Sequence, residues 1–157
     1  MKRFFALMFV FLCLQPGIAA QTPYDSMDFS VVDSFVLSVK YQNDISKLAF
    51  DLTDRFPDDI DKTRAIFKWI TNNIAFDFRF INRGKEIEKP DCYGDDACPS
   101  ILIKWENDYL KRILKSKKAI ADGYARLFKK LCDICYVQAE MIPGYARTRP
   151  YQIGNSI

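Results

Sequence analysis

The chain has 157 residues, of which 49% are hydrophobic and 15% aromatic, and its 23 lysines and arginines nearly balance 20 aspartates and glutamates. This composition suits one globular domain and excludes a disordered or fibrous protein. The 157 residues include no histidine. That excludes the histidine base of serine and cysteine hydrolases, the imidazole ligands of most catalytic zinc sites and a histidine pH switch.

Residues 1–20 have the pattern of a secretory signal peptide. A basic start at Lys2 and Arg3 precedes an apolar run of eleven residues, and the segment ends in the small residues Ala19 and Ala20. The run is too short for a transmembrane helix, which needs about 20 apolar residues. We therefore expect an exported protein, periplasmic or extracellular, with no stable membrane anchor.

Cys13 offers an alternative, a lipoprotein signal in which this cysteine is acylated. Such a signal has small residues just before the cysteine, whereas Phe11 and Leu12 stand there in this chain. Cleavage near Ala19 or Ala20 is the interpretation that the pattern favours.

Removal of the signal takes away Lys2 and Arg3 and lowers the formal net charge from +3 to +1. A nearly neutral protein is not predicted to bind nucleic acid or an anionic membrane, because such binding depends on a clear basic excess. One basic run remains, and its helical spacing predicts the solvated side of a helix. It consists of Lys111, Arg112, Lys115, Lys117 and Lys118.

Residues 21–43 form an N-terminal segment for which the pattern predicts no definite structure. From Asp44 onward, apolar residues recur at steps of three and four and predict a helix that ends before Pro57. These residues are Ile45, Leu48, Ala49 and Leu52.

A second helix is predicted from Pro57, since proline suits a first turn and acidic residues there face unpaired amides. Its acidic residues are Asp58, Asp59 and Asp61, its predicted buried face carries Ile60, Phe67, Ile70 and Ile74, and Arg64 and Lys68 are predicted to face solvent. Beyond it, Phe76, Phe78 and Phe80 alternate with charged residues, which predicts an extended segment.

Residues 82–99 are rich in charge, glycine and proline and predict an irregular excursion. Cys92 and Cys98 flank a five-residue polar stretch that contains a glycine, and such a loop can bend to form a local disulfide. A zinc site built from the four remaining cysteines is disfavoured, because zinc ribbons usually have two to four residues between paired cysteines. We expect no metal and no cofactor.

Two further helices are predicted before the chain turns extended. The first runs from about Ile101 to Lys115 and places on one side Trp105, Tyr109, Leu110, Ile113 and Leu114. The second runs from Ala121 to about Asp133, with a predicted buried face of Tyr124, Ala125, Phe128, Leu131 and Cys132. Alternation from Val137 to Met141 then predicts a strand with a bend at Pro143-Gly144.

Cys132 and Cys135 form a C-x-x-C pair near the predicted end of the last helix. A reactive pair gains its low pKa at a helix N-terminus, where the dipole favours thiolate. Buried structural cysteines are therefore the favoured interpretation.

Two segments resemble the core of the transglutaminase-like superfamily, which shares a papain-like cysteine peptidase core. One is Lys117-Lys118-Ala119-Ile120-Ala121-Asp122-Gly123-Tyr124-Ala125-Arg126-Leu127-Phe128, followed by Val137-Gln138-Ala139-Glu140-Met141-Ile142-Pro143-Gly144-Tyr145-Ala146. The other is the upstream helix Thr63-Arg64-Ala65-Ile66-Phe67-Lys68-Trp69-Ile70-Thr71-Asn72-Asn73-Ile74. The resemblance covers about residues 58–147.

The resemblance implies an α+β fold: the helical half and the first sheet strand of a transglutaminase-like or papain-like domain at 44–157, incomplete at its C-terminus. The family's nucleophile is a cysteine that begins the helix, where amides and dipole stabilise thiolate. Ala121 stands at that position. Cys132 lies eleven residues on, about 16 Å by helix rise, and cannot replace it.

Without the cysteine or the histidine, acyl transfer by the family's route is not expected, and the chain is predicted to be an inactive relative, truncated as well as degenerate. An alternative is a secreted, non-catalytic module whose cleft, around Asp122, Gly123 and Tyr124, holds a protein or peptide ligand. Gly123 and Tyr124 also suit packing positions, and Asp122 a helix-start residue. An unrelated helical exported protein is the third hypothesis.

Overall fold

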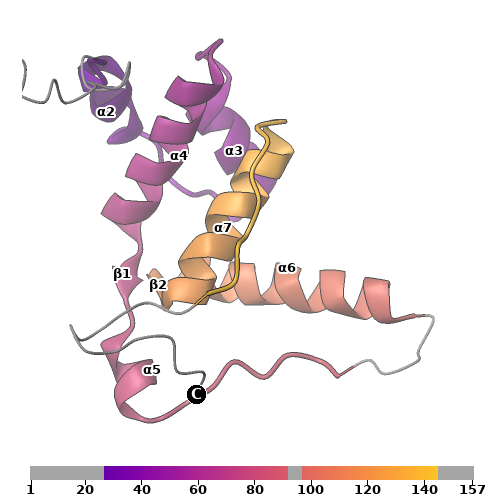
Figure 1. Ribbon diagram of the computed structural model, residues 1–157. Helices are drawn as coiled ribbons and strands as arrows, with labels where there is room; N and C mark the ends of the chain where they lie inside the picture. The colour runs from indigo at the N-terminus through magenta and orange to yellow at the C-terminus, as the bar shows by residue number, and fades with distance from the viewer. Residues whose placement is uncertain (1–26, 92–96, 145–157) are drawn as a thin grey trace, which may run out of the picture.

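The computed structural model describes residues 27–91 and 97–144. Its elements in chain order are α2 (Ser30–Val36), α3 (Ile45–Thr53), α4 (Asp59–Asn73), β1 (Ala75–Phe76), α5 (Phe78–Asn82), α6 (Cys98–Ser116), β2 (Lys118–Ala119) and α7 (Ala121–Ile134) (Figure 1). The described part is mostly helical with one small sheet, which is consistent with the predicted α+β class. The expected signal peptide lies outside the described residues.

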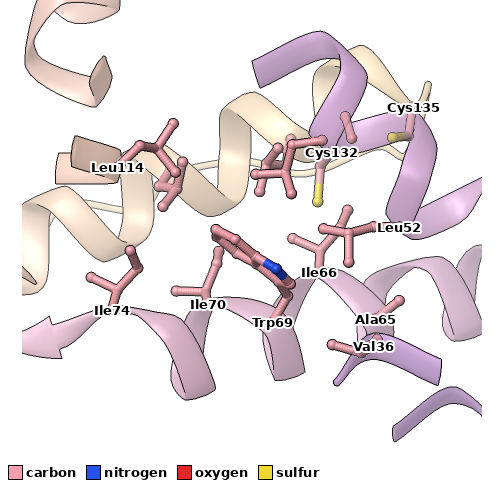
Figure 2. Close-up of a cluster of buried hydrophobic side chains, with 14 of the residues drawn as sticks. Val36, Leu52, Ala65, Ile66, Trp69, Ile70, Ile74, Leu114, Cys132 and Cys135 are labelled. Carbon is pink, nitrogen blue, oxygen red and sulfur yellow. The ribbon is translucent and has the colours of Figure 1, made fainter. Parts of the chain in front are cut away.

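The core forms where α4 and α7 pack together, with α2 and α3 against α4 (Figure 1). Trp69 lies at its centre and is only 2% exposed, with Ile66 and Ile70 on the same helix (Figure 2). The Trp69 indole Nε1–H donates a 3.0 Å hydrogen bond to the Val39 carbonyl, so the only polar atom of this side chain is satisfied. This arrangement buries a large aromatic ring without leaving a polar group unpaired.

The helix of α3 begins as its sequence predicts. The Asp44 carboxylate accepts hydrogen bonds from the amides of Ser46 at 2.8 Å and Lys47 at 3.0 Å, which caps the helix. The predicted apolar positions Leu48, Ala49 and Leu52 are buried. The helix ends at Thr53, before Pro57, as the residue pattern predicted.

The predicted buried face of α4 was wrong at two positions. Ile60 is 39% and Phe67 is 51% exposed. The buried residues include Ala65, which lies beside Val36 of α2, and Ile66, which lies next to α3 (Figure 2). Because neighbouring helices contact α4 on this side, the buried arc is rotated from the one that its apolar spacing predicted.

β1 and β2 form a parallel pair in which Ala75 lies opposite Lys118 and Phe76 opposite Ala119. The extended segment predicted through Phe80 is therefore wrong beyond Phe76. The Asp77 carboxylate accepts a 3.1 Å hydrogen bond from the Phe80 amide, which caps the short helix α5. This capped helical turn forms in place of the extended segment that the alternating phenylalanines predicted.

α6 lies across the end of α7 at which that helix begins, and its N-terminal half projects from the rest of the structure (Figure 1). Leu110, Ile113 and Leu114, in its C-terminal half, are buried, as predicted. Lys117 ends the helix in the left-handed conformation, with φ 55°, and its amide donates to the Ile113 carbonyl at 2.7 Å. The five basic residues between Lys111 and Lys118 are exposed, but only Lys111, Arg112 and Lys115 lie on the helix, because α6 ends at Ser116.

The strand predicted at Val137–Met141 does not form. After α7, Tyr136 takes a left-handed φ of 59° and the Val137 amide donates to the Cys132 carbonyl at 2.9 Å, so the chain reverses. Residues 137–144 then run back along α7 (Figure 1). No strand within 27–91 or 97–144 pairs with this segment, and alternation alone cannot make a sheet.

No helix among the described residues is long and apolar enough to cross a membrane.

Candidate functional site at the start of helix α7

Ala121 is the first residue of α7 and its side chain is exposed. The preceding residue, Ile120, is extended with φ −100° and ψ 178°, and no side chain caps this helix end. The first amides of α7 are therefore not covered by a capping group, and the helix dipole favours negative charge there. A cysteine side chain at position 121 would have the surroundings that stabilise a thiolate, but a methyl group occupies the position.

Gly123 is buried where α7 crosses α6. A Cβ atom added to it would lie 2.7 Å from Cδ1 of Ile113, 3.0 Å from Cβ of Ala119 and 3.0 Å from the phenol oxygen of Tyr109. These distances are shorter than van der Waals contact, so only glycine permits this approach of the two helices. The structure therefore gives Gly123 a packing position.

Tyr124 ties the start of α7 to the end of α4. Its phenol donates a 2.6 Å hydrogen bond to the main-chain carbonyl of Ile74. Burial raises the pKa of this phenol, so it remains a donor at neutral pH. The bond holds β1, which begins directly after Ile74, beside the segment that leads into α7.

Asp122 belongs to a charged cluster on the other side of the helix. It accepts a 2.8 Å hydrogen bond from Nε of Arg126, one turn later, and Arg126 also contacts the Glu106 carboxylate at 3.0 Å. The guanidinium lies 5.2 Å from the centre of the Trp105 ring. Asp122 thus links α7 to α6 through Arg126, in addition to adding negative charge near the helix start.

A pocket of about 610 Å³ is lined by Ala119 and Ile120, the two residues that precede Ala121, whereas Ala121 itself does not line it. On the α6 side lie the stacked rings of Trp105 and Tyr109, whose centres are 5.5 Å apart. The other lining residues are Asp77, Phe80, Lys85, Glu86, Ile87, Glu88, Arg112, Ile113, Ser116, Lys118, Ala119 and Ile120. Asp122, Gly123 and Tyr124, expected around a cleft, do not line this pocket.

The residue pattern predicted where α7 begins, but it did not predict which residues line the pocket. Trp105 and Tyr109 share a helical face in the sequence, which predicted core packing, yet both are only half-buried. Asp77 directly follows β1 and Lys118 begins β2, and strands of two residues leave no periodic signal. The chemistry that surrounds position 121 therefore depends on contacts between segments that are distant in the chain.

The two cysteines at the C-terminal end of α7 lie far from position 121 and are not activated. Cys132 and Cys135 are free and buried near the far end of the helix (Figure 2). Burial raises the pKa of Cys132 to about 11, and burial also raises that of Cys135, which accepts a 3.0 Å hydrogen bond from the Thr53 hydroxyl. Both thiols stay protonated at neutral pH, as expected for structural cysteines.

Cys98 is disulfide-bonded. Cys92, its predicted partner, lies outside the described residues, so the Cys92–Cys98 pairing stays a prediction. In the described part of the chain, no group of three or more histidine, cysteine, aspartate or glutamate side chains is arranged to hold a metal ion.

Comparison with known proteins finds similar sequences that cover most of the chain. It is 28% identical over 134 residues to Kyphoscoliosis peptidase of Mus musculus and 28% identical over 132 residues to that of Homo sapiens, which cover 85% and 84% of this chain. Hillarin of Drosophila melanogaster is 29% identical over 136 residues, or 83% of the chain. The matched region spans only 17% of either peptidase and 14% of Hillarin.

No family model matches the chain, and no solved structure matches it significantly. The chain is thus similar, over most of its length, to Kyphoscoliosis peptidase, a transglutaminase-like protein.

Proposed function

We propose that this chain is an exported transglutaminase-like protein that has lost the catalytic nucleophile and binds a protein or peptide segment instead of cleaving or transferring one. The observation that carries the proposal is Ala121, which begins α7 at an uncapped helix N-terminus and directly follows Ile120, a residue that lines the pocket of about 610 Å³. The similarity to Kyphoscoliosis peptidase supports the family.

Loss of catalysis follows from the chemistry of the groups near position 121. Cysteine-dependent amide chemistry needs a thiolate and a base within hydrogen-bond reach of it. The pocket is lined by carboxylates, cations and aromatic rings but by no thiol. The 157 residues contain no imidazole that could act as the base.

The pocket supports binding because it combines apolar and polar groups. Ring faces of Trp105 and Tyr109 provide apolar contact area, and Arg112 and Lys118 form no ion pair within the described residues. A polypeptide segment offers both apolar side chains and main-chain carbonyls to such a surface. A protein or peptide ligand is therefore better matched to the pocket than a purely apolar one.

The proposed loss of catalysis is tested with the full chain and its Ala121→Cys variant. Hydrolysis of labelled casein and incorporation of a fluorescent primary amine into casein are measured for both proteins. We expect no turnover from either, because restoring the thiol does not supply an imidazole. Turnover by the unmodified chain would refute the proposed loss of catalysis, and turnover by the variant would refute the requirement for a histidine.

The binding part is tested by filling the pocket. Ser116 lines it and Lys115, the preceding residue on α6, does not. Anisotropy of labelled, reduced and carboxymethylated ribonuclease A, a generic unfolded polypeptide, is measured with the chain and with Ser116→Trp and Lys115→Trp. Binding by the chain that Ser116→Trp weakens at least tenfold and Lys115→Trp leaves unchanged supports the proposal. No binding, or equal binding by both variants, contradicts it.

A further inference from the structure

One wall of the pocket is a short irregular segment, Lys85–Glu88, which we name the strap. All four of its residues line the pocket, opposite Trp105, Tyr109 and Ile113 of α6. The strap follows α5, and the chain beyond α5 runs beside α6 (Figure 1). The strap and α6 therefore each form part of the pocket wall.

The strap is fastened by few interactions. Within the described residues it makes two hydrogen bonds: the Lys85 amide donates to the Phe80 carbonyl at 3.3 Å, and the Trp105 indole Nε1–H donates to the Glu88 carbonyl at 2.8 Å. Ile87 is its only half-buried side chain, and the other three residues are exposed. Segments with so few buried contacts open locally before the fold unfolds.

Charge does not fasten the strap. Lys85, Glu86 and Glu88 form no ion pair within the described part of the chain, although Arg112 and Lys118 line the same pocket. Exposed charges that form no close ion pair are largely screened by salt. The far end of the strap is therefore held by the Trp105 hydrogen bond and the packing of Ile87.

Gly84 provides a hinge at the base of the strap. Its φ is +60°, and a Cβ atom added to it would meet nothing within 4 Å. Its amide donates to the Ile81 carbonyl at 2.9 Å, which ends α5. Left-handed glycine in open space lets the chain change direction there without a steric clash.

We propose that the strap closes the pocket beside Ala121 and swings about Gly84, with the Trp105 indole as its latch. The strap itself presents a main-chain carbonyl to the indole N–H and a branched aliphatic side chain to the pocket. An extended peptide offers these same two groups, so the strap occupies the place of such a ligand and opens to admit it. The claim that the strap competes with a peptide rests on the proposed binding function. The claim that the Trp105 hydrogen bond holds the strap closed does not.

The latch is tested in the full chain by NMR, because the chain has two tryptophans and hence two indole N–H signals. The Trp69 indole, bonded to Val39 in the core, is an internal control. Ile87→Ser should raise the hydrogen-exchange rate of the Trp105 indole at least fivefold and leave that of Trp69 unchanged. Ile81→Ser is the matched control, because Ile81 is 50% exposed and does not line the pocket.

A second measurement uses cleavage by endoproteinase Glu-C after Glu86 and Glu88. Trp105→Phe removes the donor but keeps a ring, and should raise the cleavage rate at these two sites at least fivefold. Trp69→Phe, which removes the other indole donor, should not raise it selectively. A Trp105 indole that exchanges as fast in the parent chain as in free tryptophan, or equal cleavage of the parent chain and Trp105→Phe, would overturn the latch.

The competition between the strap and a peptide is tested separately, by a binding measurement. Ile87→Ser should bind the labelled unfolded ribonuclease A at least threefold more tightly than the parent chain, since less of the binding energy is spent on opening the strap. Weaker or unchanged binding by this variant, with the indole result as expected, would refute the competition between strap and peptide. Binding by neither protein would refute the proposed binding function and leave the latch supported.

Discussion

The phenol of Tyr124 on the first turn of α7 donates a 2.6 Å hydrogen bond to the main-chain carbonyl of Ile74, fifty residues earlier in the chain. Ile74 ends α4 and is followed at once by β1. The Tyr124 side chain therefore joins the end of α4, which leads into β1, to the first turn of α7, which follows β2. This bond fixes where α7 begins.

Tyr124→Phe should lower the free energy of unfolding by about 1 kcal/mol, because the Ile74 carbonyl loses its partner while the ring remains. Urea unfolding of the two proteins measures the difference. Tyr136→Phe is the control, since Tyr136 is 90% exposed and should not change stability. Equal stability of Tyr124→Phe and the parent chain would show that the bond contributes nothing to the fold.

Gly123→Ala should destabilise the chain by about 1–2 kcal/mol, because overpacking outweighs the gain in helix propensity. The added Cβ would lie 2.7 Å from Cδ1 of Ile113. Ile113→Val removes that atom, so the double variant should recover part of the loss. Gly144→Ala, where nothing lies within 4 Å, is the control. A Gly123→Ala protein as stable as the parent would contradict the close packing of α6 and α7.

The buried thiol of Cys132 should make stability depend on pH above 9. Its pKa is raised by burial from 9.0 to about 11, so the folded chain keeps a proton that the unfolded chain releases. The contribution of the protonated Cys132 thiol to the free energy of unfolding is constant below about pH 9. It falls as pH rises toward 11, by about 2–3 kcal/mol at most. Urea unfolding of the parent and Cys132→Ala should therefore converge in this window. A pH-independent difference would contradict the shift.

Asp33 and Arg64 should couple α2 to α4. Two hydrogen bonds of 2.6 and 2.7 Å join them, and Lys68 lies 3.4 Å from the same carboxylate. The Arg64 hydrogen bond lowers the pKa of Asp33, so the stabilisation is present above pH 3.8 and is lost as pH falls through the lowered value. Because both side chains are partly exposed, we expect a coupling of about 0.5–1 kcal/mol.

A double-mutant cycle with Asp33→Asn and Arg64→Gln measures this coupling. It should weaken in 1 M salt, where exposed charges are screened. A coupling near zero at low salt would show that the N-terminal residues 27–43 do not depend on this ion pair for their place in the fold.

The helices could be predicted because their signals are local. Asp44 and Pro57 bound α3, and the apolar period of α6 and α7 is regular over several turns. The rotated face of α4 could not be predicted, since it depends on where α2 and α3 pack. The predicted strand at Val137–Met141 needed a neighbour to pair with, and a period of two carries no information about a neighbour.

The candidate site was predictable only in part. The residue pattern predicts that a helix begins at Ala121, and the resemblance to the transglutaminase-like superfamily marks that position as a candidate site. The pocket beside it does not, since the strap at Lys85–Glu88 and the rings on α6 meet through tertiary contacts. The hydrogen bond from Trp105 to Glu88 joins segments that no periodicity connects.

The thiol pKa of a cysteine placed at position 121 tests most directly whether the start of α7 can activate a nucleophile. Ala121→Cys is compared with Ala125→Cys, which places the same side chain one turn further along α7. Position 125 is exposed, so the prediction that it lies on the buried face of the helix was wrong. The rate of iodoacetamide alkylation, followed by peptide mapping at each pH, gives the pKa of each new thiol. We expect a pKa about one unit below the ordinary value of about 8.5 at position 121 and an ordinary value at position 125. Equal pKa values at the two positions would contradict the assignment of Ala121 to a vacated nucleophile position.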